Sequence, residues 1–244
     1  MVNLKSVKTQ FSIFLAAFAL YLSVKDKDAL FLLKSLIAVV SCVTFETVFS
    51  YLKNKKIELT ESPVISGLII GLVFSSDEPW WMFVLVCLFA IGSKYLIRLK
   101  GKHLFNPAAF GVFLATVLFG ASTQWKGTYL WYILVPAGFY FIYKIRKIEL
   151  LTGYALTALL LFGIQAIIQK VPLVNIFGYM SYFYIFVMLI EPKTTPIKRR
   201  GKFIFGASVA VLIFVLTEMG ARFDVELCSL LVMNLSVPIL NKLA

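Results

Sequence analysis

The chain has 244 residues, of which 60% are hydrophobic and 16% aromatic, and only 15% are charged. Soluble domains carry about 25% charged residues, and the mean hydropathy of this chain is +0.89. Composition therefore excludes a soluble globular fold and a disordered chain. The net charge is +12, but the chain is too apolar to be soluble in water. The basic charge therefore does not indicate a nucleic-acid-binding domain. We predict an all-α polytopic membrane protein with a single integral membrane domain over residues 1–244.

Apolar runs between charged or Pro/Gly clusters are the candidate membrane segments, because a spanning helix needs roughly 20 apolar residues. Their approximate ranges are 9–24, 30–52, 62–75, 79–97, 106–121, 127–145, 149–169, 173–190, 203–219 and 225–241. The first run follows Lys5 and Lys8 as a signal sequence would, but the Lys25 to Asp28 stretch after it offers no small-residue cleavage site. We therefore expect ten segments, of which 9–24 is the first.

The distribution of basic residues predicts the orientation, since cytoplasmic loops collect Lys and Arg. With ten crossings, eighteen of the 24 Lys and Arg residues fall on the side of both termini and five on the other. Lys34 lies within a segment. We therefore expect a multi-pass protein of the inner (cytoplasmic) membrane with cytoplasmic N and C termini, and we interpret the basic charge as topogenic rather than as lipid or nucleic-acid recognition.

Two of the ten segments are unsuited to a simple crossing. Residues 62–75 would form about 21 Å of helix against a hydrocarbon core of about 30 Å, and they include Gly67 and Gly71. Residues 173–190 are interrupted by Gly178. We expect half-length or broken helices at both places, and tight helix packing through small residues is the alternative explanation.

Each of these two segments is the third of five in its half of the chain. An odd number of crossings per half inverts the second half relative to the first. Short or Gly-interrupted segments at corresponding places indicate a site between inverted repeats. We therefore expect two inverted five-helix repeats over residues 1–125 and 126–244.

Ionisable residues at membrane depth are costly and therefore informative. Lys34 lies one turn inside its segment, where it can extend toward the interface, and we expect a structural role. Glu46 has no basic residue at i±3 or i±4, so either a partner on another helix holds it or it stays protonated. Glu218 lies at a segment end, where it can reach water.

Two segments on the predicted cytoplasmic side carry distinctive chemistry. In GKHLFNPAAFG, Asn106 can cap a helix with Pro107 at its first position, and such a helix start suits a carbonyl-rich or anionic ligand. In EPKTTPIKRRG, prolines prevent helix continuation while Thr194 and Thr195 offer hydroxyls. An ordinary capped loop is the alternative for the second segment.

Metal-binding and catalytic patterns are absent from the sequence. Cys42, Cys87 and Cys228 lie singly inside apolar runs, and His103 is the only histidine. Neither a disulfide framework nor a cysteine-ligated metal is supported. We expect no metal site and assign no catalytic residue.

Several motifs together resemble one family, the integral membrane flavin subunits of ion-motive redox complexes. This RnfD/NqrB family comprises RnfD of the Rnf complex and NqrB of the sodium-translocating NADH:quinone reductase. The matching segments are Glu61 to Leu68, Pro79-Trp80-Trp81, Phe105-Asn106-Pro107-Ala108, Glu191-Pro192 to Pro196, Arg200 to Gly206 and Leu231 to Leu240. Glu46 also falls where the family often has a glutamate. Order and spacing agree over most of residues 40–242.

The resemblance implies a flavin, riboflavin or FMN, bound by a subunit that transfers electrons within an Rnf/Nqr-like complex. The cofactor-contacting positions it implies are Ser66, Gly67, Asn106, Pro107, Glu191, Thr194 and Thr195. It implies other membrane subunits as partners, with quinone as a candidate acceptor and the lipid bilayer as surroundings. The redox chemistry would belong to the cofactor.

The chain also departs from the family pattern. The family carries FMN on a threonine of an outward loop, whereas here that loop is only Gly120 to Gly127 and lacks the upstream Asp. Ser122 and Thr123 are the hydroxyls that a covalent flavin would use in it, and we expect a non-covalent flavin instead. The acidic residue of the Asp-Pro loop is here the longer Glu191.

Two other functions remain open at this point. A chain without the flavinylation loop, on a broken-helix plan shared with urea and ammonium transporters, could be a small-solute channel or transporter, for example a flavin carrier. A scaffold within a larger redox complex is the third class. A flavin spectrum of the purified protein separates the first two.

Overall fold

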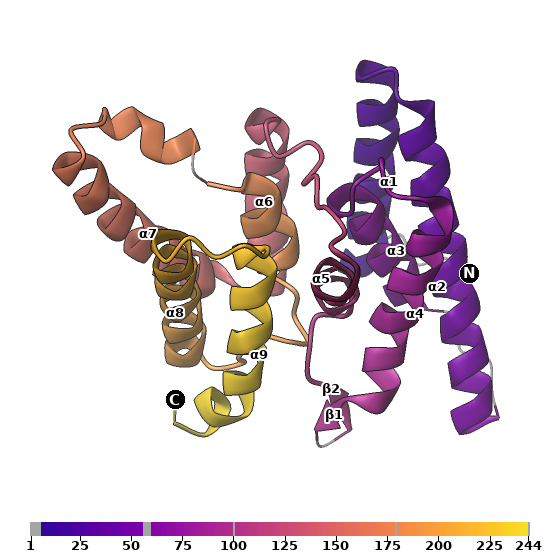
Figure 1. Ribbon diagram of the computed structural model, residues 1–244. Coiled ribbons are helices and arrows are strands. Elements are labelled where there is room, and N and C mark those ends of the chain that lie inside the picture. Colours follow the sequence, from indigo (N-terminus) through magenta and orange to yellow (C-terminus); the bar gives the residue numbers. More distant parts are fainter. Residues whose placement is uncertain (1–5, 56–59, 100, 179, 244) are drawn as a thin grey trace. The chain divides into compact units, whose positions relative to one another are not determined.

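The computed structural model describes residues 6–55, 60–99, 101–178 and 180–243 (Figure 1). The chain divides into two compact units, Met1–Gly127 (unit 1) and Thr128–Ala244 (unit 2). This boundary lies close to the expected one between residues 125 and 126, but the single membrane domain stays a prediction. Lys5, Lys56 and Lys100, which contribute to the predicted charge asymmetry, lie outside the described residues.

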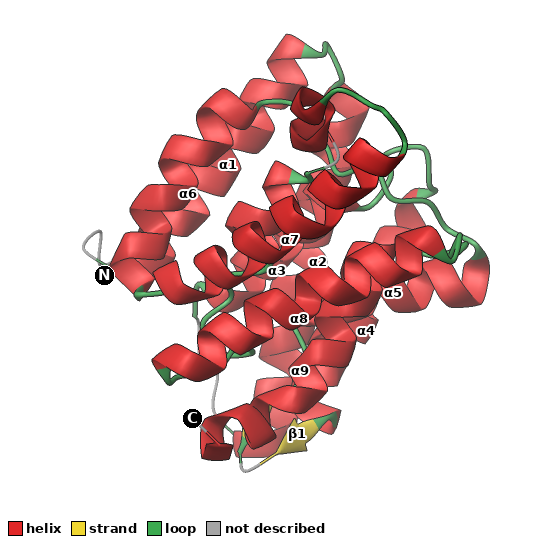
Figure 2. Ribbon diagram, turned by 90° about the vertical axis from the view of Figure 1, so that its left-hand side faces the viewer, coloured by secondary structure: helices red, strands yellow, loops and turns green. Residues whose placement is uncertain are grey.

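Unit 1 is a helical body with one short hairpin. Its elements are α1 (Val7–Lys25), α2 (Ala29–Asn54), α3 (Ser62–Val73), α4 (Trp80–Leu96), β1 (Arg98–Leu99), β2 (Lys102–His103) and α5 (Pro107–Phe119). The short helix α3 packs mainly on α2 and also contacts α1, α4 and α5. Helices dominate the described structure, with loops between them (Figure 2), and the β1–β2 hairpin was not expected.

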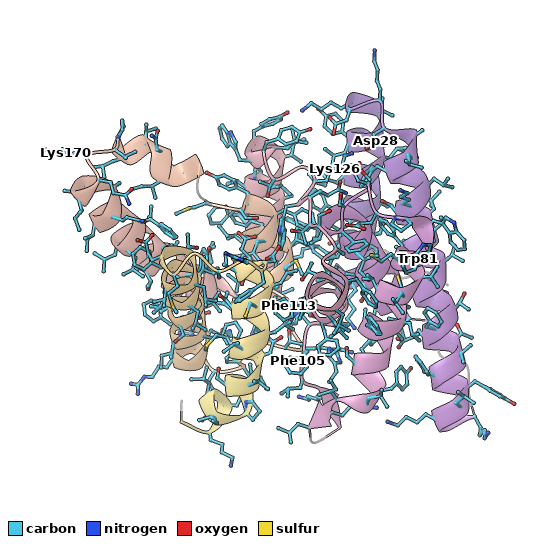
Figure 3. The ribbon with its side chains drawn as sticks, in the orientation of Figure 1. Asp28, Trp81, Phe105, Phe113, Lys126 and Lys170 are labelled. Carbon is cyan, nitrogen blue, oxygen red and sulfur yellow. The ribbon has the colours of Figure 1, made fainter. Side chains whose placement is uncertain are left out.

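The start of α2 shows how local sequence defines a helix end in unit 1. The side chain of Asp28 accepts a hydrogen bond from the Phe31 N–H at 2.8 Å, as an N-cap does. Asp28 also pairs with Lys126, which follows α5 (Figure 3). Burial raises the pKa of Asp28, but the hydrogen bonds from Lys126 and Phe31 outweigh it and hold the pKa below its usual value. This end of unit 1 is therefore tied together by a charged pair.

Unit 2 has four longer helices and two short helical turns. Its elements are α6 (Trp131–Ile145), α7 (Ile148–Ile168), the 3-10 helix η1 (Leu173–Gly178), the π-helical turn η2 (Tyr184–Met188), α8 (Arg199–Glu218) and α9 (Val225–Leu243). Helix α8 packs on both α7 and α9, while η1 contacts α7 and η2 contacts α6.

Each of the ten expected segments coincides with helical structure. Among the described residues, α1, α2, α7, α8 and α9 are long and apolar enough to cross a membrane, and α3, α4, α5 and α6 are shorter. The expected 62–75 segment forms the 12-residue helix α3, and the 173–190 segment is divided between η1 and η2. The chain is thus a helical membrane-embedded protein, and ten crossings in inverted repeats remain a prediction.

Candidate functional site

The first polar group inside unit 1 is an ion pair between α2 and α4. Lys94 Nζ lies 2.6 Å from Glu46 Oε2, and both side chains are largely buried. Lys94 also donates to Ser62 Oγ at 3.3 Å, and the Tyr95 hydroxyl donates to Glu46 Oε1 at 3.3 Å. Of the two states expected for Glu46, the structure shows the one in which another helix supplies a partner. The pair joins α2 and α4 to the first residue of α3.

Asn106 and Pro107 form a helix start of the expected kind. Asn106 Oδ1 accepts from the Ala109 N–H at 3.0 Å, and Pro107 is the first residue of α5. The Asn106 side chain is buried. The helix cap thus engages the side-chain oxygen of Asn106.

The small residues of α3 contact α2. A methyl group on Gly67 would lie 2.5 Å from Val39 Cα, and one on Gly71 would lie 2.5 Å from Ser35 Oγ. Ser66 Oγ donates to the Ser62 carbonyl at 3.1 Å. Such close approach is typical of small-residue helix interfaces. Gly67 and Gly71 therefore act in packing, and no observation here favours a transport pathway lined by them.

The loop that contains Ser122 and Thr123 closes the carboxyl end of α3. Gln124 N donates to Val73 O at 2.8 Å, Lys126 N donates to Leu72 O at 2.7 Å, and Gln124 Nε2 donates to Gly71 O at 3.3 Å. Thr123 pairs with the extended Phe74. These bonds satisfy carbonyls that a helix end otherwise leaves without partners. The loop thus caps the short helix.

Ser122 in that loop is bound to the connection that precedes α4. Its N–H and its hydroxyl donate to Glu78 Oε1 at 2.8 and 3.0 Å. Lys34, buried on α2, donates to the carbonyls of Ser76 and Glu78, both at 2.7 Å. Lys34 was expected to have a structural role, and it clamps this connection.

In unit 2 the Glu191–Thr195 segment forms a compact turn. Thr194 Oγ1 donates to Glu191 Oε2 at 3.3 Å, and Thr195 Oγ1 donates to the Glu191 carbonyl at 2.8 Å. Asn234 on α9 donates to the Thr194 carbonyl at 2.9 Å. Thr194 and Thr195 are both buried. The turn therefore holds the Glu191 carboxylate in a defined position.

Lys147, between α6 and α7, is the cation of this turn. Its Nζ donates to Thr195 Oγ1 at 2.5 Å and to the Pro196 carbonyl at 2.9 Å. Burial lowers the pKa of Lys147 to about 8, and the positive charge of Lys202 contributes while Glu149 opposes the shift. The Thr195 hydroxyl is thus engaged both as donor and as acceptor, which gives it a positioning role in the turn.

The predicted site residues fall into two groups. Ser66, Gly67, Asn106, Pro107, Ser122 and Thr123 belong to unit 1, and Glu191, Thr194 and Thr195 belong to unit 2. Asn106 and Thr194 belong to different units, and the structure describes each unit by itself. A cavity shared by the two residues therefore stays a prediction. No group of three or more His, Cys, Asp or Glu side chains that could hold a metal occurs among the described residues.

Three lysines with structural roles escaped the sequence analysis. Lys94 and Lys147 were counted only as loop charges, and Lys126 was not linked to Asp28. Lys94 lies inside the 79–97 run and Glu46 inside the 30–52 run, so two opposite charges within apolar runs were the available signal. Lys147 gave no comparable signal, because a basic loop residue is ordinarily solvated.

The protein is a polytopic α-helical membrane protein, as three features indicate. Its helices are apolar, an ion pair lies inside the helical packing, and its short helices are capped. The model of the NQR2, RnfD, RnfE family matches residues 3–132 and 128–244. The chain therefore belongs to this family, as the resemblance implied.

Curated relatives agree with this assignment, and three of them are named as the D component of an ion-translocating oxidoreductase complex. The protein of Buchnera aphidicola is 32% identical over 100 residues, covering 39% of this chain and 29% of the relative. That of Shewanella amazonensis is 21% identical, covering 84% of this chain and 82% of the relative. That of Alcanivorax borkumensis is 26% identical, covering 81% of this chain and 44% of the relative. The chain thus spans less than half the length of the first and third of these relatives.

Proposed function

We propose that this protein is the electron-transferring membrane subunit of an Rnf-like ion-translocating redox complex and that it holds riboflavin or FMN without a covalent bond. The observation that carries the proposal is the family match over both units of the chain. The names of the relatives support membership of a multi-subunit complex. Other membrane subunits are the proposed partners, with quinone as the proposed acceptor.

In unit 1, Asn106 is the residue proposed to contact the flavin. Its side-chain oxygen caps α5, and we propose that its amide group donates to a ring carbonyl. The N–H groups of the first turn of α5 carry the positive end of the helix dipole, which favours an electron-rich ligand. A flavin held there would be stabilised in its reduced form. Pro107 orients this helix start because its ring presets the backbone angle.

In unit 2, Glu191 and Thr194 are the proposed contacts. The turn holds the Glu191 carboxylate through Thr194 Oγ1, so it can accept from a ring N–H. Thr195 is proposed as a positioning residue, since its hydroxyl already serves the Glu191 carbonyl and Lys147. The flavin, when bound, supplies the electron-transfer chemistry, and the residues of this chain bind and orient it.

The geometry of the 120–127 loop supports non-covalent binding. Ser122 Oγ donates to Glu78, and Thr123 lies in the extended pair with Phe74. A phosphoester on either hydroxyl would disturb the loop that caps α3. We propose that the loop has a structural role here.

The proposed topology has ten membrane segments in two inverted repeats, with both termini in the cytoplasm of an inner membrane. A recurring contact supports the repeats. Lys34, near the start of α2, binds two backbone carbonyls of the connection before α4, and Lys147, just before α7, binds one of the connection before α8. Helices α4 and α8 are the fourth predicted segments of their units. Cysteine labelling tests the orientation, with Asp77→Cys expected to react from outside and Lys198→Cys from inside. A Lys198→Cys variant that reacts from outside contradicts it.

The spectrum of the purified protein tests the flavin. We expect a yellow protein with flavin fluorescence, and we expect denaturation to release the flavin into solution. A colourless protein that binds neither riboflavin nor FMN contradicts the proposal. A flavin that stays on the denatured chain and maps to Ser122 or Thr123 contradicts the non-covalent part alone.

A further inference from the structure

The Leu231 to Leu240 motif of the family resemblance takes no part in the proposed flavin contacts. It lies on α9, one of the five described helices long and apolar enough to cross a membrane. Asn234 in this motif is fully buried. A buried amide on such a helix is costly unless hydrogen bonds engage it. What Asn234 binds therefore indicates why α9 carries it.

The Asn234 side chain binds the backbone of the Glu191–Thr195 turn. Its Nδ2 donates to the Thr194 carbonyl at 2.9 Å, and both residues are buried. Water does not replace a hydrogen bond lost between buried groups, so removal of the donor has the full cost of an unsatisfied carbonyl. Asn234 acts on the main chain, while the Thr194 side chain donates to the Glu191 carboxylate.

A second asparagine of α9 binds the same loop three residues further along. Asn241 Oδ1 accepts from the Ile197 N–H at 2.9 Å. Asn241 follows Asn234 by seven residues, which is two turns of helix, and residues with this spacing lie on one face. One face of α9 thus binds the loop at Thr194 and again at Ile197, with a donor at the first place and an acceptor at the second.

Pro238 lies in α9 between the two asparagines. Proline has no N–H, so it cannot donate to the carbonyl of Asn234 four residues earlier, and a proline inside a helix bends it. The helix continues past Pro238 to Leu243 (Figure 1). Pro238 therefore influences the direction of the last turns, which carry Asn241 to the Ile197 amide.

Lys147 holds the loop between these two points. It donates to Thr195 Oγ1 and to the Pro196 carbonyl from the connection between α6 and α7. The loop from Thr194 to Ile197 is therefore bound at consecutive residues by α9 and by Lys147. Contacts of this kind fix the backbone from which the Glu191 and Thr194 side chains extend.

We propose that α9 positions the Glu191–Thr195 turn for the flavin, with Asn234 as the donor and Asn241 as the acceptor. The inference rests on the proposed function, because Glu191 and Thr194 are the flavin contacts that the turn would carry. Both asparagines are positioning residues, which act through the loop backbone. Asp has nearly the size of Asn but only accepts hydrogen bonds when ionised, so the two positions should respond in opposite ways to the same substitution.

Substitution by Asp tests these roles in the purified full-length protein, with affinity measured by riboflavin fluorescence titration. Asn234→Asp sets an acceptor against the Thr194 carbonyl, and flavin affinity should fall about tenfold. Asn234→Leu removes the donor without adding charge and should lose as much. Asn241→Asp keeps an acceptor for the Ile197 N–H and should bind flavin normally, whereas Asn241→Ala should lose about threefold. Asn175→Asp, at an exposed asparagine of η1, is the control.

Hydrogen exchange followed by mass spectrometry reports on the loop without flavin. The amides of residues 193–198 should exchange about tenfold faster in Asn234→Leu and Asn241→Ala, and at the normal rate in Asn241→Asp. The Asn241 pair alone decides if the Asn234 variants do not fold. Asn241→Asp behaving like Asn241→Ala, or unchanged exchange in every variant, would overturn the proposal. Faster exchange with unchanged flavin affinity would also overturn it, since the turn would then not serve the flavin.

The two measurements separate this inference from the proposed function. If the unmodified protein binds no flavin, the proposed function fails, and the positioning role for the flavin fails with it, while the exchange rates still show whether α9 anchors the turn. If the unmodified protein binds flavin and the asparagine variants bind it equally well, only the inference about α9 fails.

Discussion

The two units hold their short third segments in different ways. In unit 1, Gly67 and Gly71 bring α3 against α2, and the 120–127 loop caps its end. In unit 2, methyl groups on Gly153 and Gly206 would collide with the backbone carbonyls of Phe203 and Leu150 where α7 meets α8, and one on Gly138 of α6 would collide with the Phe186 side chain in η2. The short segment of unit 2 packs on α6 and α7 instead. One unit thus buries a short helix, and the other joins two long ones.

The two units also surround a carboxylate on an apolar helix differently. Glu46 lies in the interior of α2 and pairs with Lys94. Glu226 is the half-buried second residue of α9, and it forms no ion pair among the described residues. The ion pair gives Glu46 a structural role, because removal of either partner leaves a buried charge unpaired.

Loss of the ion pair should have the largest effect on stability. Glu46→Gln or Lys94→Met leaves one buried charge without a partner, and we expect a loss of about 3–5 kcal/mol in the free energy of unfolding. The double variant should recover most of it. Thermal unfolding in detergent measures this. Glu226→Gln is the matched control in unit 2 and should change stability by less than about 1 kcal/mol. Equal losses in the two units would break the comparison.

Added methyl groups at the α7–α8 contact should come next. Gly206→Ala places a methyl group against the Leu150 carbonyl, and a backbone obstacle gives way less than a side chain. We expect a loss of about 1–3 kcal/mol in stability, measured as a lower melting temperature. Gly163→Ala on α7 is the control, since its methyl group would lie 3.7 Å from Ile176 Cδ1. Helix propensity should make it neutral or stabilising by up to about 1 kcal/mol.

Removal of either lysine clamp should have a smaller effect. Lys34→Met leaves two backbone carbonyls without their donor, at a cost of about 1–3 kcal/mol. Lys147→Met should cost less near neutral pH, because burial already disfavours the charge of Lys147. Parallel thermal melts of the two variants measure the difference. A larger loss for Lys147→Met would show that its hydrogen bonds outweigh its desolvation.

The Lys147 clamp should depend on pH. The pKa of Lys147 is about 8 in the folded protein, below the ordinary 10.5, so between these values the unfolded chain binds more protons. The free energy of unfolding should therefore rise from pH 8 to about pH 10.5. Lys147→Met should remove this rise, and Lys34→Met should keep it. The charges of Lys202 and Glu149 also act on Lys147, so the variant carries the assignment.

The smallest effect on stability, with a large effect on the cofactor, is expected at Asn106. Asp caps a helix about as well as Asn, so Asn106→Asp should unfold normally while losing the donor and adding repulsion toward a ring carbonyl. Flavin affinity should fall about tenfold or more, equivalent to about 1.4 kcal/mol.

Thr194→Val should lower the flavin affinity too, with the exposed Thr152→Val as control. Full flavin content in Asn106→Asp and Thr194→Val would contradict the proposed contacts.

Local signals in the sequence predicted the elements well. The Asn106-Pro107 helix start and the short 62–75 segment both appear in the structure, because caps, prolines and apolar runs act over a few residues. The partner of Glu46 was not predictable in this way. Lys94 lies 48 residues away in the sequence, and neither residue indicates by itself which helices will meet.

The sequence by itself determined that the chain is a helical membrane protein, where its apolar segments lie and which family it resembles. The composition of a chain reflects the solvent around it, and short motifs act between neighbouring residues. Tertiary structure decided which charged side chains form ion pairs. It made Gly67 a packing residue, turned the 120–127 loop into a cap for α3, and left Glu226 without a cation among the described residues. These outcomes depend on how helices pack against one another, because a hydrogen bond or an ion pair requires two groups within about 3–4 Å.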